Sequence, residues 1–170
     1  MATRAGNSDG SDVTKIEFLM KKSGIDITAR RVIGDALVRA ESTGAPAVAI
    51  ELPDGQIVTG KTTPLLGPAS AALLNALKVL AGISHDIPLI SPNVIEPISD
   101  LKINHMGNHN PRIHTDEVLI ALAISAATNP VAELAMQQIS NLMNSDAHST
   151  TMMSSVDINM FHKLGINLTC

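Results

Sequence analysis

The hydrophobic positions first follow a helical spacing and then, near residue 46, change to the spacing of strands. Apolar residues recur three and four positions apart in two early stretches, which is the pattern of helices with one buried face. Gly24 and Gly44 follow these stretches, and glycine commonly ends a helix. The pattern therefore predicts helices over residues 12–22 and 28–42.

Residues 46–59 have the pattern of a β-hairpin. Pro46-Ala-Val-Ala-Ile-Glu-Leu52 is a nearly continuous apolar run that is typical of a buried strand. Pro53-Asp-Gly55 has the composition of a tight turn, and Gln56-Ile-Val-Thr59 is rich in β-formers. We expect these two strands to pair.

Beyond residue 60, helical and strand patterns alternate. Further helices are predicted over residues 70–81, 92–101, 115–128, 130–143 and 156–163, and further strands over residues 87–90, 149–153 and 166–169. Such alternation favours an α/β fold in which helices cover both faces of a sheet, that is, a three-layer α-β-α sandwich. We divide the chain into a tail (1–12), a helical segment (13–44) and an α/β sandwich (45–170).

The composition limits the functions that this chain can have. Hydrophobic residues make up 45% and charged residues 16%, so the chain is too apolar to be disordered. The net charge of −4 offers no basic surface for nucleic acid or for an anionic membrane. Phe18 and Phe161 are the only aromatic residues, so stacking platforms for nucleic-acid bases are lacking as well.

The sequence lacks a long apolar run and a second cysteine, and both facts bear on the cellular location of the protein. The longest apolar run, 118–127, is far shorter than the ~20 residues of a membrane-spanning helix. Cys170 is the only cysteine, so neither an internal disulfide nor a cysteine-based metal site can form within one chain. We therefore expect a cytoplasmic protein.

Gly55-Gln-Ile-Val-Thr-Gly-Lys-Thr62 matches the phosphate-binding loop pattern GxxxxGK[ST] letter by letter. That motif requires a flexible loop that follows a strand and leads directly into a helix. Here Gly55 lies in the predicted turn, the intervening residues are β-formers, and Pro64 follows closely. We reject a nucleotide-binding loop, although Lys61 and Thr62 could still hold an anion near the next helix.

Residues 104–117 form the most polar segment of the chain. They run Asn-His-Met-Gly-Asn-His-Asn-Pro-Arg-Ile-His-Thr-Asp-Glu and lead into a predicted helix, whose N-terminus favours negative charge. Histidine, asparagine and arginine are the side chains that transfer protons, orient ligands and neutralise anions. The candidate site residues are Lys61, Thr62, Asn108, His109, Asn110 and Arg112 for ligand binding, and His105, His109 and His114 for catalysis.

Three interpretations of this segment remain open. Arg112, a histidine and the helix N-terminus could hold a phosphate or a carboxylate. Alternatively, the three histidines together with Asp116 or Glu117 could bind a divalent metal, although their spacing matches no established motif. In the third interpretation, the side chains only satisfy one another in a buried turn.

Four segments of this sequence resemble a known family. They are Glu51-Leu-Pro-Asp-Gly-Gln-Ile-Val-Thr-Gly-Lys-Thr62, Leu89-Ile-Ser-Pro-Asn-Val-Ile-Glu-Pro-Ile98, Asn108-His-Asn-Pro-Arg-Ile-His-Thr-Asp-Glu-Val-Leu-Ile120 and Leu164-Gly-Ile-Asn-Leu-Thr-Cys170. They are similar to the C-terminal region of domain-of-unknown-function family 1846, also called uncharacterised protein family 0371. The resemblance runs from about residue 13 to the end.

The resemblance implies a cytidine-deaminase-like sandwich and a longer protein whose N-terminal region is missing here. It does not imply deaminase chemistry, because that reaction needs an H-x-E and a P-C-x-x-C motif to hold zinc, and this sequence has neither. No cofactor and no reaction are implied.

We therefore expect a C-terminal module that binds a small anionic or phosphorylated ligand, as part of an active site that the N-terminal region completes. One alternative is a non-catalytic module that forms a homo-oligomer or docks onto the N-terminal region through the apolar helices of residues 118–143. A divalent-metal-dependent enzyme is the third hypothesis.

Overall fold

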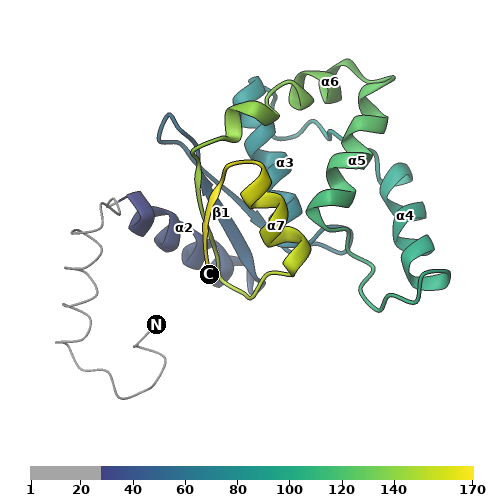
Figure 1. Cartoon of the computed structure of the whole chain (residues 1–170), viewed down its shortest axis with the longest axis horizontal. Helices are drawn as coiled ribbons and strands as arrows, with labels where there is room; N and C mark the ends of the chain where they lie inside the picture. The colour runs from purple at the N-terminus through teal and green to yellow at the C-terminus, as the bar shows by residue number, and fades with distance from the viewer. Residues whose placement is uncertain (1–27) are drawn as a thin grey trace.

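The computed structural model describes residues 28–170 and contains a four-stranded mixed sheet with helices on both faces (Figure 1). The predicted tail and the predicted helix over residues 12–22 lie outside the described residues. The strands are β1 (Ala47–Glu51), β2 (Ile57–Lys61), β3 (Asp146–Ser149) and β4 (Asn167–Thr169), and their order is β2-β1-β3-β4.

The predicted hairpin is present and sets the register of the sheet. β1 pairs antiparallel with β2, so that Ile50 lies opposite Val58, and Gly55 takes a positive φ of 92° in the turn between them. β1 is buried at every position, as its continuous apolar run predicts, because it lies between β2 and β3 with helices above and below. β3 and β4 pair in parallel and are joined through a helix.

Helix α2 (Thr28–Thr43) covers one face of the sheet. Its Val32 and Ala36 pack with Ala49 of β1 in a small buried cluster, and the two are four positions apart, so both lie on one helical face. We predicted this helix as part of a segment that precedes the sandwich. In the structure it is packed on the sheet, and the division at residue 45 stays a prediction.

Helix α3 (Pro68–Ala81) covers the opposite face and packs most closely on β2. The contact is made at Gly60, where an added Cβ atom would lie 2.5 Å from Ala72 Cα and 2.6 Å from the carbonyl carbon of Ala71. Only glycine permits so close an approach of two backbones. Gly60 therefore serves helix packing, and its strand conformation supports the rejection of a phosphate-binding loop.

The remaining helices lie on the same side of the sheet as α3 and complete the main core (Figure 1). They are α4 (Pro92–Asn104), α5 (Thr115–Ala126), α6 (Pro130–Met136), the short 3₁₀ helix η2 (Ile139–Leu142) and α7 (Ser155–Lys163). Leu73, Leu77, Ile113, Leu122 and Phe161 are fully buried between these elements. The structure thus shows a mixed α/β fold, and no helix among the described residues is long and apolar enough to cross a membrane.

Three predicted elements differ from the structure. Residues 87–90 form no strand; Pro88 lacks the N–H that a ladder needs, and Leu89 and Ile90 are buried in a connecting segment instead. The strand predicted over 149–153 lies at Asp146–Ser149, where it finds β1 and β4 as partners. The helix predicted over 130–143 ends at Met136, and η2 follows it.

Candidate functional site

Two loops that are far apart in sequence meet beside the N-terminus of α3. Arg112 Nε donates a hydrogen bond of 2.7 Å to the carbonyl of Thr63. The backbone N–H of Ile113 donates to the Leu65 carbonyl at 3.0 Å, and the Ser70 hydroxyl donates to the Ile113 carbonyl. The loop that carries Lys61 and Thr62 and the polar segment 104–114 are therefore neighbours.

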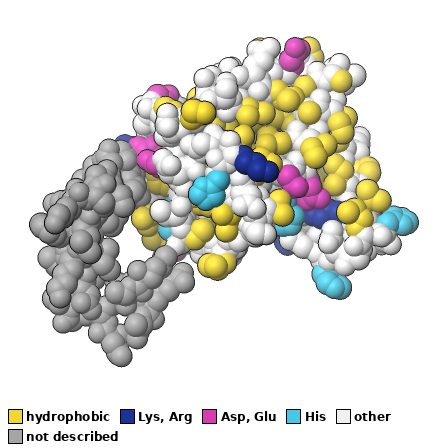
Figure 2. All heavy atoms as spheres, viewed as in Figure 1, with side chains coloured by type: hydrophobic (Ala, Val, Ile, Leu, Met, Phe, Trp, Pro, Cys, Tyr) yellow, Lys and Arg dark blue, Asp and Glu magenta, His cyan; other side chains and the backbone are white. Residues whose placement is uncertain are grey.

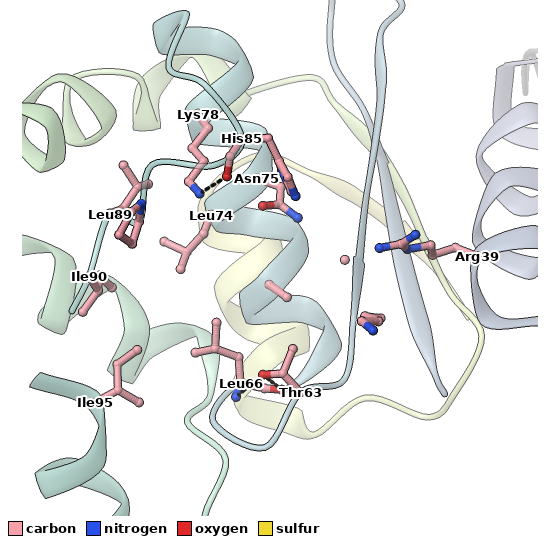
Figure 3. A pocket seen from close by; sticks show the side chains of 14 residues that line it. Arg39, Thr63, Leu66, Leu74, Asn75, Lys78, His85, Leu89, Ile90 and Ile95 are labelled. Carbon is pink, nitrogen blue, oxygen red and sulfur yellow. Dashed lines mark hydrogen bonds between the residues drawn. The ribbon is translucent and has the colours of Figure 1, made fainter. Parts of the chain in front are cut away.

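One pocket lies along the open edge of β2, and we call it the edge pocket (Figure 3). Its volume is about 280 Å³. β2 is the outermost strand, and its Thr59 carbonyl points outward, where it accepts a hydrogen bond from Asn75 Nδ2 of α3 at 2.9 Å. Apolar side chains of α3, α4 and the connecting segment line much of the pocket: Leu66, Leu74, Leu89, Ile90 and Ile95.

Three cationic side chains line the edge pocket, and no carboxylate does. Arg39 reaches it from α2, Lys61 from the end of β2 and Lys78 from α3. Figure 3 shows Arg39 on the opposite side of β2 from the side chains of α3. Positive charge therefore approaches the edge of the sheet from both faces.

Two of these cations have hydrogen-bond donors that the described residues do not fully satisfy. Arg39 Nε is buried and has no hydrogen-bond partner among the described residues. The Lys78 amine donates to the backbone carbonyl of His85 at 3.1 Å (Figure 3). Burial holds the pKa of Lys78 below its usual value, and the negative charge of Asp86 partly opposes this effect. An anion in the pocket would relieve the cost of burying these charges.

A second, more open pocket of about 500 Å³ lies over the polar segment, and we call it the loop pocket. Its lining consists of Lys102, Asn108, His109, Asn110, His114, Asp116, Glu117 and Val156. The two carboxylates outnumber the single lysine, so this pocket lacks the cationic excess of the edge pocket.

Lys102 of α4 is the most buried charged group of the loop pocket, with 4% of its side chain exposed. Its amine lies 2.8 Å from Glu117 Oε1 and donates to the Arg112 carbonyl at 2.7 Å. The same Glu117 oxygen accepts from the backbone N–H of His114, which is half of a capping box at the start of α5. Lys102 is thus committed to fastening α4 to α5 and to the polar segment.

His114 is the one histidine of the polar segment that lies beside a carboxylate. Its Nδ1 lies 3.5 Å from Asp157 Oδ2 of α7. The other oxygen, Asp157 Oδ1, accepts from both the backbone N–H and the hydroxyl of Thr115 at 2.9 and 2.7 Å. A carboxylate beside a histidine ring can orient the ring for proton transfer, here toward a group in the loop pocket.

The structure distributes the predicted site residues over two places. Lys61 lines the edge pocket, whereas Asn108, His109, Asn110 and His114 line the loop pocket. Three predicted residues line neither pocket: Thr62 donates to the Pro46 carbonyl, Arg112 bridges the two loops, and His105 is exposed at the end of α4.

The described residues offer no cluster of three His, Cys, Asp or Glu side chains that could hold a metal ion. His105 and His109 are exposed, and His114 is directed to Asp157. The polar segment therefore does not gather its histidines around one point.

Arg39, Lys78 and Asp157 are the residues that the sequence analysis missed. Arg39 and Lys78 lie on helices, where a charged side chain normally indicates only a solvated face. Asp157 stands in the first turn of α7, where acidic residues are common for reasons of helix stability. No local signal distinguishes these three, because their partners come from distant parts of the chain.

Comparison with known proteins gives one consistent family. Residues 28–170 match the model described as "Domain of unknown function DUF1846, C-terminal". A UPF0371 protein of Streptococcus thermophilus (strain ATCC BAA-250 / LMG 18311) is 54% identical over 157 residues, which is 92% of this chain and 32% of the relative. A UPF0371 protein of Streptococcus pyogenes serotype M5 (strain Manfredo) is 50% identical over 159 residues, 94% of this chain and 32% of the relative. The chain thus spans about a third of the length of these relatives.

Proposed function

The chain belongs to the DUF1846 family, and from this premise we propose that it is a C-terminal module that binds a small anionic, for example phosphorylated, molecule in the edge pocket. The observation that carries the proposal is that Arg39, Lys61 and Lys78 all line one pocket and that no carboxylate lines it. The buried, unpartnered Nε of Arg39 supports it, because such a donor is costly unless a ligand accepts from it.

The side chains that line the edge pocket also favour a ligand of a particular polarity. Leucine and isoleucine side chains form much of the wall, so the proposed ligand has an apolar or weakly polar body as well as an anionic group. Lys78 and Arg39 lie on opposite sides of β2 (Figure 3), so each would bind its own acceptor of the ligand, and charge-assisted hydrogen bonds of this kind are about twice as strong as neutral ones. The outward-facing edge of β2 would lie beside the ligand.

In the full proposal, the loop pocket carries the chemistry and the N-terminal region completes the site. His114, oriented by Asp157, would transfer a proton, and Asn108 and Asn110 would orient the reacting group. Arg112 would act as a positioning residue, because it joins the two loops through Thr63. The fold itself we propose to be the cytidine-deaminase-like three-layer sandwich, without the zinc chemistry of deaminases.

A thermal-shift screen tests the binding proposal. The purified chain is heated with inorganic phosphate, pyrophosphate, nucleotides, phosphorylated sugars and small carboxylates. A ligand at a hundred times its dissociation constant stabilises the fold by about 2.7 kcal/mol, which raises Tm by about 5–10 °C for a domain of this size. We expect at least one phosphorylated compound to give such a shift, and we expect added salt to weaken it.

Variants assign the shift to a pocket. Lys78→Ala and Arg39→Ala should each remove most of it, whereas Lys163→Ala, at an exposed lysine of α7 that lines neither pocket, should leave it unchanged. A shift that persists in both pocket variants would contradict the edge pocket. If such a shift is lost in His114→Ala instead, the ligand belongs to the loop pocket.

A second candidate function, a non-catalytic docking module, is favoured by a different observation. The outer surface of α5 and α6 is apolar and exposed.

A further inference from the structure

The outer surface of α5 and α6 consists of exposed apolar side chains. Ile120 and Ile124 are each 61% exposed on α5, and Leu134 is 49% exposed on α6. Ala123 and Ala127 are exposed between them. We call these five residues the α5/α6 face, and Figure 2 shows hydrophobic side chains gathered over this part of the molecule.

The α5/α6 face is unusual because α5 is apolar on both of its sides. Val118 and Leu122 are fully buried toward the core, while Ile120 and Ile124 point outward. No charged residue occurs from 118 to 132, and the next residue, Glu133, is exposed beside Leu134. Single exposed hydrophobic residues are ordinary, but a helix that is apolar all round is normally buried on all sides. A contiguous uncharged apolar surface marks an interaction site.

The length of the relatives indicates what covers this face. About two thirds of each UPF0371 relative lies outside the matched region, and the family model describes the matched region as C-terminal. We propose that the α5/α6 face is the docking surface for the N-terminal region of proteins of this family. A face whose centre on α5 is apolar selects a partner surface that is itself apolar, as at the centre of a stable interface between domains.

The position of this face also connects it to the loop pocket. Asp116, Ile120 and Ile124 follow one another at four-residue spacing along a single side of α5. Asp116 lines the loop pocket. A domain that covers Ile124 and Ile120 would therefore extend to the mouth of the loop pocket and place its own residues opposite His109 and His114.

Labelling with a carbene reagent, which reacts with exposed apolar side chains, tests the proposal on intact proteins. The chain itself and the full-length Streptococcus thermophilus relative are labelled at the same concentration, and the peptides that contain α5 and α6 are compared. We expect strong labelling of these peptides in this chain and loss of most of that label in the relative. Equal labelling in the two proteins would overturn the proposal.

Dilution and substitution distinguish docking of the N-terminal region on this face from covering of the face by another occupant. Protection by a region of the same polypeptide does not depend on concentration, so protection that disappears on dilution would identify a second copy and overturn the proposal. Lysine at the relative's positions that align with Ile120 and Ile124 should restore labelling of α5 and α6. Lysine at the position that aligns with Val38, which is 64% exposed on α2, is the matched control and should not.

The same substitutions in this chain test whether a loss of folding could account for the restored labelling. Ile120→Lys and Ile124→Lys place a good helix former at exposed helical positions, so Tm should stay within about 2 °C of the parent chain. A large loss of Tm in the isolated chain would mean that the two isoleucines serve its own core, which would also overturn the proposal.

Discussion

At the scale of the residue, Gly60 shows how one missing side chain sets a tertiary contact. The backbone of α3 occupies the space that a side chain at this position would take. Neither backbone can move away cheaply, because β2 is paired with β1 and α3 is packed into the core. The position therefore requires glycine for reasons of space and not of backbone conformation, since Gly60 lies in a regular strand.

We expect Gly60→Ala to destabilise the chain by about 2–3 kcal/mol or more, because overpacking against backbone forces strands or helices apart. Gly34→Ala on α2 is the matched control: beyond the helix's own backbone the added methyl meets nothing within 4 Å, and alanine favours the helix by about 0.5–1 kcal/mol. Urea unfolding of both variants measures the difference. A Gly60→Ala chain as stable as the parent would show that α3 approaches β2 less closely.

At the scale of the element, α4 is joined to its neighbours by a buried charge as well as by apolar packing. Few side chains of α4 are buried, and Lys102 is one of them together with Ile95 and Ser99. Its amine joins α4 to Glu117 at the start of α5 and to the backbone of the polar segment. The placement of the loop pocket therefore depends on the packing of one helix against the cap of another.

Lys102→Met should destabilise the chain by about 2–3 kcal/mol, somewhat less than for a fully buried pair because a quarter of the Glu117 side chain is exposed. Lys163→Met, at an exposed lysine of α7, should change stability by no more than about 0.5 kcal/mol. Adding Glu117→Gln to Lys102→Met should cost less than the two single changes together, because the carboxylate has already lost its partner. Additive losses in this double-mutant cycle would contradict a direct interaction.

At the scale of the whole molecule, the sheet joins segments from both ends of the described chain. β3, from residue 146 onward, lies between β1 and β4, and its His148 hydrogen-bonds through Nδ1 to the Thr169 hydroxyl at 2.8 Å. Burial lowers the pKa of His148 below its usual value of 6.5, because the charged ring would lose water. Protonation of this histidine therefore lowers the stability of the sheet.

Below a pH of about 6.5 the unfolded chain binds a proton at His148 more readily than the folded chain does, so the free energy of unfolding should fall as the pH is lowered through that range. Above it both states are neutral and the contribution is complete. His148→Gln should make the fall smaller, whereas His162→Gln, at an exposed histidine of α7, should leave it unchanged. Urea unfolding at several pH values measures this, and identical pH profiles for the parent and His148→Gln would contradict the prediction.

Local patterns were sufficient to predict most of the elements. The hairpin of β1 and β2, and the helices α3, α5 and α7, follow from apolar spacing, glycine and proline within the adjacent residues. The strand predicted at 87–90 was wrong because a short apolar run can be buried in a connecting segment as well as in a sheet. β3 begins three residues before its predicted position, because its position depends on partners that lie about 100 residues away.

The sequence by itself determined that this chain has a mixed α/β fold, belongs to its family, and carries one polar segment ahead of an apolar helix, because these properties rest on neighbours in the chain. Only the tertiary structure decided which charges meet. It brought Arg39 and Lys78 to Lys61 at the edge of β2, committed Lys102 to Glu117, and set Asp157 behind His114. The physical reason is that each of these relations joins two helices, or a helix and a strand, whose side chains meet only after the core between them has packed.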